Sequence, residues 1–228
     1  LAGAAGVAGA AANCLTRSLI SAANDTTYAA RGWFGPRREV HAAVDVNFEL
    51  RRGQTLGIVG ESGSGKSTVA RCIVRLVDPS GGEILIDGED IARMGAGALR
   101  PLRRKVQIVF QDPYRSLNPR RTVGEAIIEG PLNYGVSRAE ALERARNLMG
   151  LVRMDAAALE RYPHQFSGGQ RQRICIARAL AMEPELLVAD EAVSALDVSV
   201  QAQVLQLLEE IRTRLNLAML FITHDLRV

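Results

Sequence analysis

The chain has 228 residues, of which 47% are hydrophobic and 23% are charged, and its formal net charge is +3. This length and composition suit one large domain, or one domain with an embedded subdomain, and they allow a packed core. Because no long basic stripe accompanies the small net charge, we expect no nucleic-acid partner, and three widely separated cysteines without a CxxC pair argue against a metal site built on cysteine.

Residues 1–12 are rich in alanine and glycine, so we expect a linker or a disordered end there, followed by one folded unit over residues 13–228. No stretch of the sequence is long and apolar enough to cross a bilayer. The first strand is expected where apolar residues alternate with polar ones, at Val44, Val46, Phe48 and Leu50.

The next elements surround a glycine-rich loop. A short apolar run at residues 56–59 predicts a buried strand before the loop. Apolar residues at helical spacing over 69–77 predict a helix after it, which is expected to end at 79–82. Further strands are predicted at 83–87 and 106–110.

From Asp112 to Met182 the spacing of apolar residues becomes helical. Ser137 and Glu140 fit a capping box, which predicts a helix that opens there and runs through about Met149. We therefore expect a helical subdomain over about 112–182.

The last elements return to the alternation of strand and helix. A buried strand is predicted at 186–189, a long amphipathic helix at 200–215 and a final strand at 217–223. The whole order predicts an α/β core with a helical subdomain inserted into it.

A nucleotide-binding loop is predicted directly after the strand at 56–59. The loop matches GxxxxGK[ST], whose glycines let backbone N–H groups point at phosphate oxygens, and the following helix adds partial positive charge. Lys66 is expected to neutralise the β- and γ-phosphates of ATP, and the Ser67 hydroxyl to ligate Mg²⁺. The expected nucleotide contacts are Gly60, Glu61, Ser62, Gly63, Ser64, Gly65, Lys66, Ser67 and Thr68.

Two carboxylates follow the apolar strand at 186–189. In a protein with a phosphate loop, Asp190 is placed to hold Mg²⁺ through its water shell, and Glu191 to polarise an attacking water as a catalytic base. Acidic residues also follow strands as helix caps, but the phosphate loop favours the catalytic interpretation.

The segment 166–170 (FSGGQ) resembles the LSGGQ signature of ABC ATPases, with Phe in the first place. A Ser and two Gly at the start of a helix form a second anion-binding motif. In that family the motif contacts the γ-phosphate held by the opposite subunit of a head-to-tail dimer. The other family motifs stand in the family's order, with the phosphate loop and Gln111 before the signature, and Asp190-Glu191, Ser194-Ala195-Leu196-Asp197 and His224 after it.

The resemblance implies the fold of an ABC ATPase, which is an α/β P-loop NTPase (RecA-like) core with an inserted helical subdomain. It also implies a role for each matching residue. Gln111 contacts the Mg²⁺ and water region and relays contact with the membrane subunits, Asp197 lies at the dimer interface, and His224 contacts the γ-phosphate. The signature residues implied to contact nucleotide are Ser167, Gly168, Gly169 and Gln170.

In this family the adenine usually stacks on an aromatic side chain upstream of the phosphate loop. Tyr28 is our first choice for this role, and Trp33 and Phe34 are the alternatives. An ordinary surface aromatic is nearly as good an interpretation of each.

Three longer segments, 109–120, 161–180 and 190–208, look like the ATPases of dipeptide and oligopeptide importers, and nickel and glutathione importers share the likeness. The resemblance implies ATP hydrolysis that powers the import of peptides or a related small solute. The implied location is the cytoplasmic face of the inner membrane. The implied partners are a second ABC ATPase subunit, two permease subunits and, indirectly, a solute-binding protein.

Two features depart from the family. Ala192 stands where a proline usually follows the catalytic Glu, which should alter the stiffness of the loop more than its chemistry. The first residue is not Met and the chain stops at Val228, before further core elements of the family, so we expect a fragment or part of a longer polypeptide.

Other classes of protein explain the motifs less well. ABC ATPases of DNA repair carry a long coiled coil between Gln111 and the signature, whereas this interval is short and lacks sustained heptads. Translation factors of the family usually carry two cassettes. The signature and His224 argue against a small-molecule kinase, and Glu191 argues against a regulatory domain that binds ATP without cleaving it.

Overall fold

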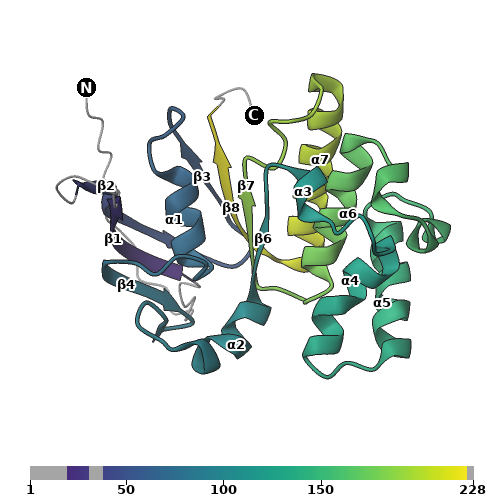
Figure 1. The fold of residues 1–228 in the computed structure, drawn as a ribbon, viewed down its shortest axis with the longest axis horizontal. Coiled ribbons are helices and arrows are strands. Elements are labelled where there is room, and N and C mark those ends of the chain that lie inside the picture. The colour runs from purple at the N-terminus through teal and green to yellow at the C-terminus, as the bar shows by residue number, and fades with distance from the viewer. Residues whose placement is uncertain (1–19, 31–37, 225–228) are drawn as a thin grey trace, which may run out of the picture.

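The computed structural model describes the backbone of residues 20–30 and 38–224, and side chains from residue 46 onward. Figure 1 shows two sheets in this part of the chain, with one helix between them and a group of helices beyond the second sheet. Among the described residues, no helix combines the length and the apolar character that a membrane span requires.

A parallel sheet lies at the centre of the molecule (Figure 1). Its strands are, in spatial order, β3 (Thr55–Val59), β8 (Ala218–Thr223), β7 (Leu186–Asp190) and β6 (Val106–Val109). Successive side chains point to opposite faces, so Leu186 and Val188 enter one core while Leu187 and Ala189 enter the other. Because both faces are covered, β7 and β8 are apolar along their length rather than alternating.

The first core lies between the parallel sheet and a second, antiparallel sheet. The antiparallel sheet has the order β2-β1-β4-β5, with bounds β2 (Arg38–Leu50), β1 (Ile20–Ala30), β4 (Gly81–Ile86) and β5 (Glu89–Asp90). Helix α1 (Lys66–Ile73) packs between the two sheets and contacts strands of both. Helix α2 (Ala96–Lys105) closes this core with Leu99 and Leu102.

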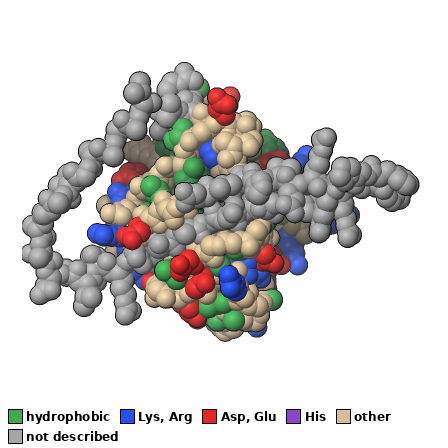
Figure 2. Space-filling model, turned by 90° about the vertical axis from the view of Figure 1, so that its left-hand side faces the viewer, with side chains coloured by type: hydrophobic (Ala, Val, Ile, Leu, Met, Phe, Trp, Pro, Cys, Tyr) green, Lys and Arg blue, Asp and Glu red, His purple; other side chains and the backbone are tan. Residues whose placement is uncertain are grey.

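Figure 2 shows the molecule from the side on which the antiparallel sheet lies. The described basic and acidic side chains on this face are interspersed rather than separated by sign. This face therefore carries charge of both signs.

The second core lies on the other face of the parallel sheet. Helices α6 (Gly168–Leu180) and α7 (Val198–Leu215) pack directly on that face, and α4 (Val123–Asn133) and α5 (Arg138–Leu151) lie outside α6 (Figure 1). Shorter elements complete this part, and they are α3 (Pro113–Ser116) and the 3-10 helices η1 (Ala156–Glu160) and η2 (Pro163–Gln165).

Side-chain caps start several of these helices. Thr122 accepts a hydrogen bond from the backbone N–H of Glu125, and the Glu125 carboxylate accepts one from the N–H of Thr122, which is a full capping box at α4. At α5, the Ser137 hydroxyl accepts a hydrogen bond from the backbone N–H of Glu140. This is one of the two hydrogen bonds that make up the predicted capping box.

Each predicted strand overlaps a strand of the structure, and the predicted alternation of strands and helices is present. Two strand predictions need correction: β1 precedes the strand that was expected to be first, and β3 is exposed or half-buried rather than buried, because it lies at the edge of the parallel sheet. One helix boundary is also wrong. The helix expected over 69–77 ends at Ile73, because Arg75 adopts a left-handed conformation with φ of 52°. The guanidinium of Arg75 is buried and donates to the backbone carbonyls of Ile91 and Met94. These contacts with a distant segment fix the turn that ends the helix.

Candidate nucleotide-binding site

The four parallel strands end at the same edge of the sheet. The strand pairing aligns these ends. Val59, the last residue of β3, lies opposite Thr223, the last residue of β8. Val109, the last residue of β6, lies opposite Ala189, which is one residue before the end of β7. The segments that leave this edge are the phosphate loop after β3, His224 after β8, Glu191 after β7 and Gln111 after β6. Strand order alone thus gathers segments that lie far apart in the sequence.

The phosphate loop runs from the end of β3 to the start of α1. Gly63 and Gly65 have φ of 83° and 89°, a conformation that glycine adopts without strain. At Gly60 a Cβ would lie 3.0 Å from the Ser64 hydroxyl, so the two chain segments approach closely there. The Lys66 side chain is only 6% exposed, and its ammonium donates to the carbonyl oxygens of Gly60 at 2.7 Å and Glu61 at 2.5 Å.

The remaining loop residues differ in exposure. Ser62 and Ser64 are exposed, while Thr68 is half-buried in the first turn of α1. The loop therefore presents its backbone and short side chains to the solvent, and its ammonium lies beneath them. Such a surface has the donors and the shape that a chain of phosphates requires.

Ser67 and Asp190 meet at the end of β7. The Ser67 hydroxyl donates to Oδ1 of Asp190 at 2.8 Å. Burial raises the pKa of the Asp190 carboxyl, while the hydrogen bond from Ser67 and the charge of Arg71 act in the opposite direction. Two oxygen ligands side by side, one of them a carboxylate at a buried position, fit the ligand preference of Mg²⁺.

Glu191 adopts a left-handed conformation with φ of 49°, which is uncommon for a residue other than glycine. Its backbone N–H donates to the carbonyl of Ile222 at 3.0 Å, which holds the turn against β8. Oε2 of Glu191 lies 3.3 Å from Nδ1 of His224. The structure thus brings together the predicted base and the predicted γ-phosphate contact.

Gln111 joins this group through a residue for which the sequence indicated no role of its own. Nε2 of Gln111 donates to the Ser194 hydroxyl at 3.0 Å, and that hydroxyl donates to the carbonyl of Glu191 at 3.0 Å. Ser194 opens the predicted motif Ser194-Ala195-Leu196-Asp197, and because it stands three residues after Glu191, its hydroxyl can return to the turn that Glu191 begins.

The second anion-binding motif lies elsewhere in the chain. Ser167 caps α6, with a full capping box in which its hydroxyl accepts from the N–H of Gln170 and its own N–H donates to the Gln170 side chain. Gly168 and Gly169 form the first turn of α6. Because α1 packs on one face of the parallel sheet and α6 on the other, the phosphate loop and this motif start on opposite sides of the sheet (Figure 1).

Two other predicted contacts are placed less fully. Asp197 is the residue before α7, and its side chain forms no cap hydrogen bond with that helix. Tyr28 belongs to β1, but its side chain lies outside the described part, and Trp33 and Phe34 lie outside the described residues altogether.

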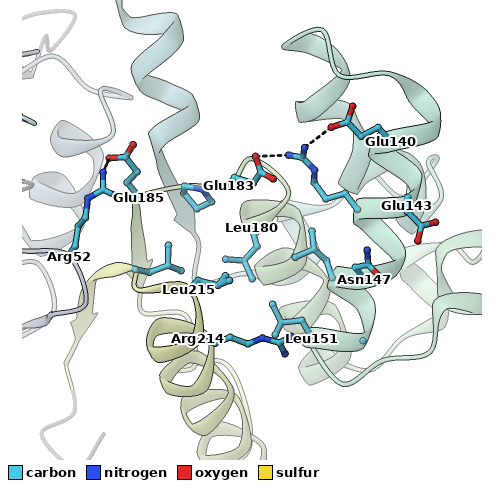
Figure 3. Close-up of a pocket in the computed structure, with 15 residues that line it drawn as sticks. Arg52, Glu140, Glu143, Asn147, Leu151, Leu180, Glu183, Glu185, Arg214 and Leu215 are labelled. Carbon is cyan, nitrogen blue, oxygen red and sulfur yellow. Dashed lines mark hydrogen bonds and ion pairs between the residues drawn. The ribbon is translucent and has the colours of Figure 1, made fainter.

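A cavity of about 890 Å³ lies away from this edge. It lies between α5, the end of α7 and the amino ends of the parallel strands, with Leu151, Leu180 and Leu215 facing it (Figure 3). Ion pairs border it, among them Arg52–Glu185 and the contact of Arg144 with Glu183. Since the strands' carboxyl ends carry the site segments, this cavity is separate from the candidate nucleotide site.

Comparison with known proteins agrees with this geometry. The ABC transporter family profile matches residues 43–194. A putative peptide import ATP-binding protein of Brucella ovis is 53% identical over 185 residues, which cover 81% of this chain and 58% of that protein. Glutathione import ATP-binding protein GsiA of Salmonella typhi is 52% identical over 192 residues, which cover 84% of this chain and 31% of that protein. The chain thus spans little more than half the length of the first relative and under a third of the second.

Solved structures share the fold. The dimeric post-hydrolysis state of the ATP-binding cassette MJ0796, bound to ADP and Pi, has a TM-score of 0.79 and 30% identity, covering 91% of this chain and 89% of that chain. CbiO1 from Clostridium perfringens, part of the ABC transporter complex cbiONQ, has a TM-score of 0.77 and 28% identity. The match covers 91% of this chain and 79% of that chain. By its sequence, its fold and the arrangement of its phosphate loop, the chain belongs to the ABC transporter family, as one of its ATP-binding cassettes.

Proposed function

We propose that the chain binds and hydrolyses MgATP as half of a head-to-tail pair, and that this reaction powers the import of peptides or a related small solute. The observation that carries the proposal is the meeting of the phosphate loop, Asp190, Glu191, His224 and Gln111 at one edge of the parallel sheet. A single edge then offers phosphate-binding, metal-binding and proton-accepting groups together.

Each group has a chemical role at this edge. Lys66 and the backbone N–H groups of the loop bind the β- and γ-phosphates, and Ser67 and Asp190, with Gln111, would hold Mg²⁺. When bound, Mg²⁺ would neutralise charge on the phosphate oxygens. Glu191 accepts a proton from the attacking water, and His224, which faces its carboxylate, contacts the γ-phosphate.

The proposed pairing rests on the two separate anion-binding motifs. One nucleotide can reach both the phosphate loop and Ser167–Gly169 when the motifs come from two chains. Large apolar side chains next to the site segments are exposed, among them Val198 after Asp197, at 82%, and Val59 before the loop, at 44%. Exposed apolar residues beside a functional edge support a contact with another cassette there. The relevant solved structures of MJ0796 are described as dimeric.

The proposed transport role is supported by the names of the relatives, which refer to peptide and glutathione import. We propose two permease subunits as partners, with a solute-binding protein acting through them, and a peripheral location on the cytoplasmic face of the inner membrane. We also propose that residues 13–228 form one ABC ATPase domain, that its helical subdomain spans about 112–182, and that residues 1–12 form a linker or disordered end. In the adenine site we retain Tyr28 as the first choice.

Uptake of labelled dipeptides and oligopeptides by the source cells tests the transport role. Deleting the gene should abolish uptake of at least one class of these peptides. The natural gene should restore it, and a Glu191→Gln gene expressed to the same level should not. Uptake that persists after deletion, or that the Glu191→Gln gene restores, would contradict the proposal.

A further inference from the structure

Gln172 is a buried polar residue in the helix that begins with the signature motif. Its side chain is 0% exposed. Nε2 donates to the carbonyl oxygen of Phe110 at 3.4 Å, whereas Oε1 is buried and has no hydrogen-bond partner within the described residues. An apolar side chain of similar size would avoid the cost of this unpaired acceptor. The amide therefore requires an explanation other than packing.

The carbonyl that accepts this hydrogen bond belongs to the residue directly before Gln111. A peptide group is planar, so the carbonyl of Phe110 and the N–H of Gln111 move as one rigid unit. A contact that fixes the carbonyl also fixes the direction in which Gln111 leaves β6. From there the side chain of Gln111 reaches Ser194, which bonds to the carbonyl of Glu191.

Two more side chains of α6 hold the same segment. The guanidinium carbon of Arg171 lies 4.0 Å from the centre of the Tyr114 ring, and Arg178 donates to the carbonyl of Ser116. Residues 171 and 178 are about two helical turns apart and so lie on one face of α6. This face binds residues 110–116 to α6, in addition to their connection to the parallel sheet through β6.

We propose that Gln172 is a positioning residue for Gln111, through which the position of α6 determines the arrangement of the loop that carries Glu191. The inference rests on the proposed ATPase function. In the proposed pair, the start of α6 contacts the nucleotide of the other chain. A shift of α6 then changes the orientation of the peptide between Phe110 and Gln111, and with it the contact between Gln111 and Ser194.

A double-mutant cycle on ATP hydrolysis tests the inference. Gln172→Leu keeps a side chain of similar volume and removes the donor. We expect it to lower kcat by about 10- to 100-fold, because small displacements at a reacting centre have effects of this size, and to leave KM for ATP unchanged. Gln111→Ala should lower kcat as well. The double variant should be no slower than Gln111→Ala alone, since Gln172 acts through Gln111.

The matched control is Ile176→Val, a small loss of volume at another fully buried position of the same helix. It should keep the parental kcat. Additive losses in the double variant, an unchanged kcat in Gln172→Leu, or an equal loss in Ile176→Val would overturn the inference. If Gln172→Leu does not fold, Gln172→Met provides the same comparison with a more adaptable side chain.

Hydrogen exchange without nucleotide gives a second readout that does not depend on turnover. Backbone amides of residues 111–117 should exchange faster in Gln172→Leu than in the natural protein, and Ile176→Val should leave their exchange unchanged. Unchanged exchange in Gln172→Leu would overturn the positioning role. If the natural protein hydrolyses no ATP, the proposed function fails, and the exchange measurement still decides whether Gln172 positions this segment.

Discussion

The hydroxyl of Ser67 donates a hydrogen bond of 2.8 Å to Oδ1 of Asp190, and this contact joins the first turn of α1 to the end of β7. The Asp190 residue is only 4% exposed. An ionised carboxylate at such a position loses most of its hydration, and one hydroxyl donor replaces little of it. The structure therefore holds a carboxylate where its charge is unfavourable, and a bound cation would compensate that charge.

The first prediction concerns the stability cost of this carboxylate. Because burial raises the pKa of Asp190, the folded state binds the proton more tightly than the unfolded state, and stability falls as pH rises through the raised pKa. Asp190→Asn removes the charge and keeps an acceptor for Ser67. Its melting temperature in EDTA should exceed that of the natural protein near pH 7. The difference should vanish below the ordinary Asp pKa of about 3.9.

Asp87 provides a control of opposite sign. Burial alone would raise its pKa, but the hydrogen bond and charge of Lys105 outweigh burial, so the pKa of Asp87 is lowered. Its ionised form stabilises the fold above the ordinary Asp pKa, and this stability is lost as pH falls through the lowered value. Asp87→Asn should therefore reduce the melting temperature near pH 7. A higher melting temperature in Asp87→Asn, or an unchanged melting temperature in Asp190→Asn, would contradict this electrostatic account.

Lys66 is predicted to supply much of the affinity for ATP. Its ammonium is held within the loop by the carbonyls of Gly60 and Glu61, and a charge-assisted contact with phosphate contributes roughly 1.5–3 kcal/mol. Lys66→Ala should raise the Kd for MgATP by about 10- to 150-fold in calorimetric titration. Lys105→Ala, which removes the partner of Asp87 at the amino end of β6, should leave the Kd unchanged. Equal affinity in Lys66→Ala and the natural protein would remove Lys66 from the site.

Glu191→Gln should separate binding from hydrolysis. The substitution keeps the size of the side chain and removes the proton acceptor, and loss of a general base typically slows a reaction by about 10²–10⁴-fold. Calorimetry should show the natural affinity for MgATP, while phosphate release should fall by that factor. Hydrolysis at the natural rate would show that Glu191 is not the base and would favour a route in which the substrate assists with His224.

Gly169 is predicted to be required by packing. A Cβ at this position would overlap Cγ1 of Val200 in α7, and overpacking of this kind costs roughly 1–3 kcal/mol. Gly169→Ala should lower the free energy of unfolding in urea by that amount, and adding Val200→Ala should restore part of it. Gly168→Ala is the matched control, because a Cβ there meets the Tyr114 hydroxyl at an ordinary 3.5 Å. If both glycine variants lose the same free energy of unfolding, and Val200→Ala restores none of it, the contact between residue 169 and Val200 does not explain the loss.

The elements that could be predicted are those whose signal is local. The strands β3 and β7 are short apolar runs next to a glycine-rich loop or an acidic pair, so a few neighbouring residues predict both strands. Burial follows for β7 but not for β3, which lies at the edge of the parallel sheet. Strand β1 was not predicted, because the alternation of apolar and polar residues that indicated the strand at 44–50 is weak in Ile20–Ala30. The position of β1 depends instead on its pairing with β2 and β4.

Helix α2 was also missed, since it contains Pro101 and a glycine and is stabilised by burial of Leu99 and Leu102. In the site, motif order predicted which residues matter but not how they meet. The contacts of Gln111 with Ser194 and of Gln172 with Phe110 join segments far apart in the sequence, and no local pattern indicates them.

The central claim is that one nucleotide contacts the phosphate loop of one chain and the signature motif of another. Sedimentation velocity of the Glu191→Gln protein, with and without MgATP, tests it most directly, and Ser167→Arg on the same background places a bulky charge at the start of α6. We predict a monomer without nucleotide, a dimer with MgATP, and no dimer with Ser167→Arg although it still binds MgATP. A protein that hydrolyses ATP at full rate as a strict monomer, or whose Ser167→Arg variant pairs as before, would contradict the account.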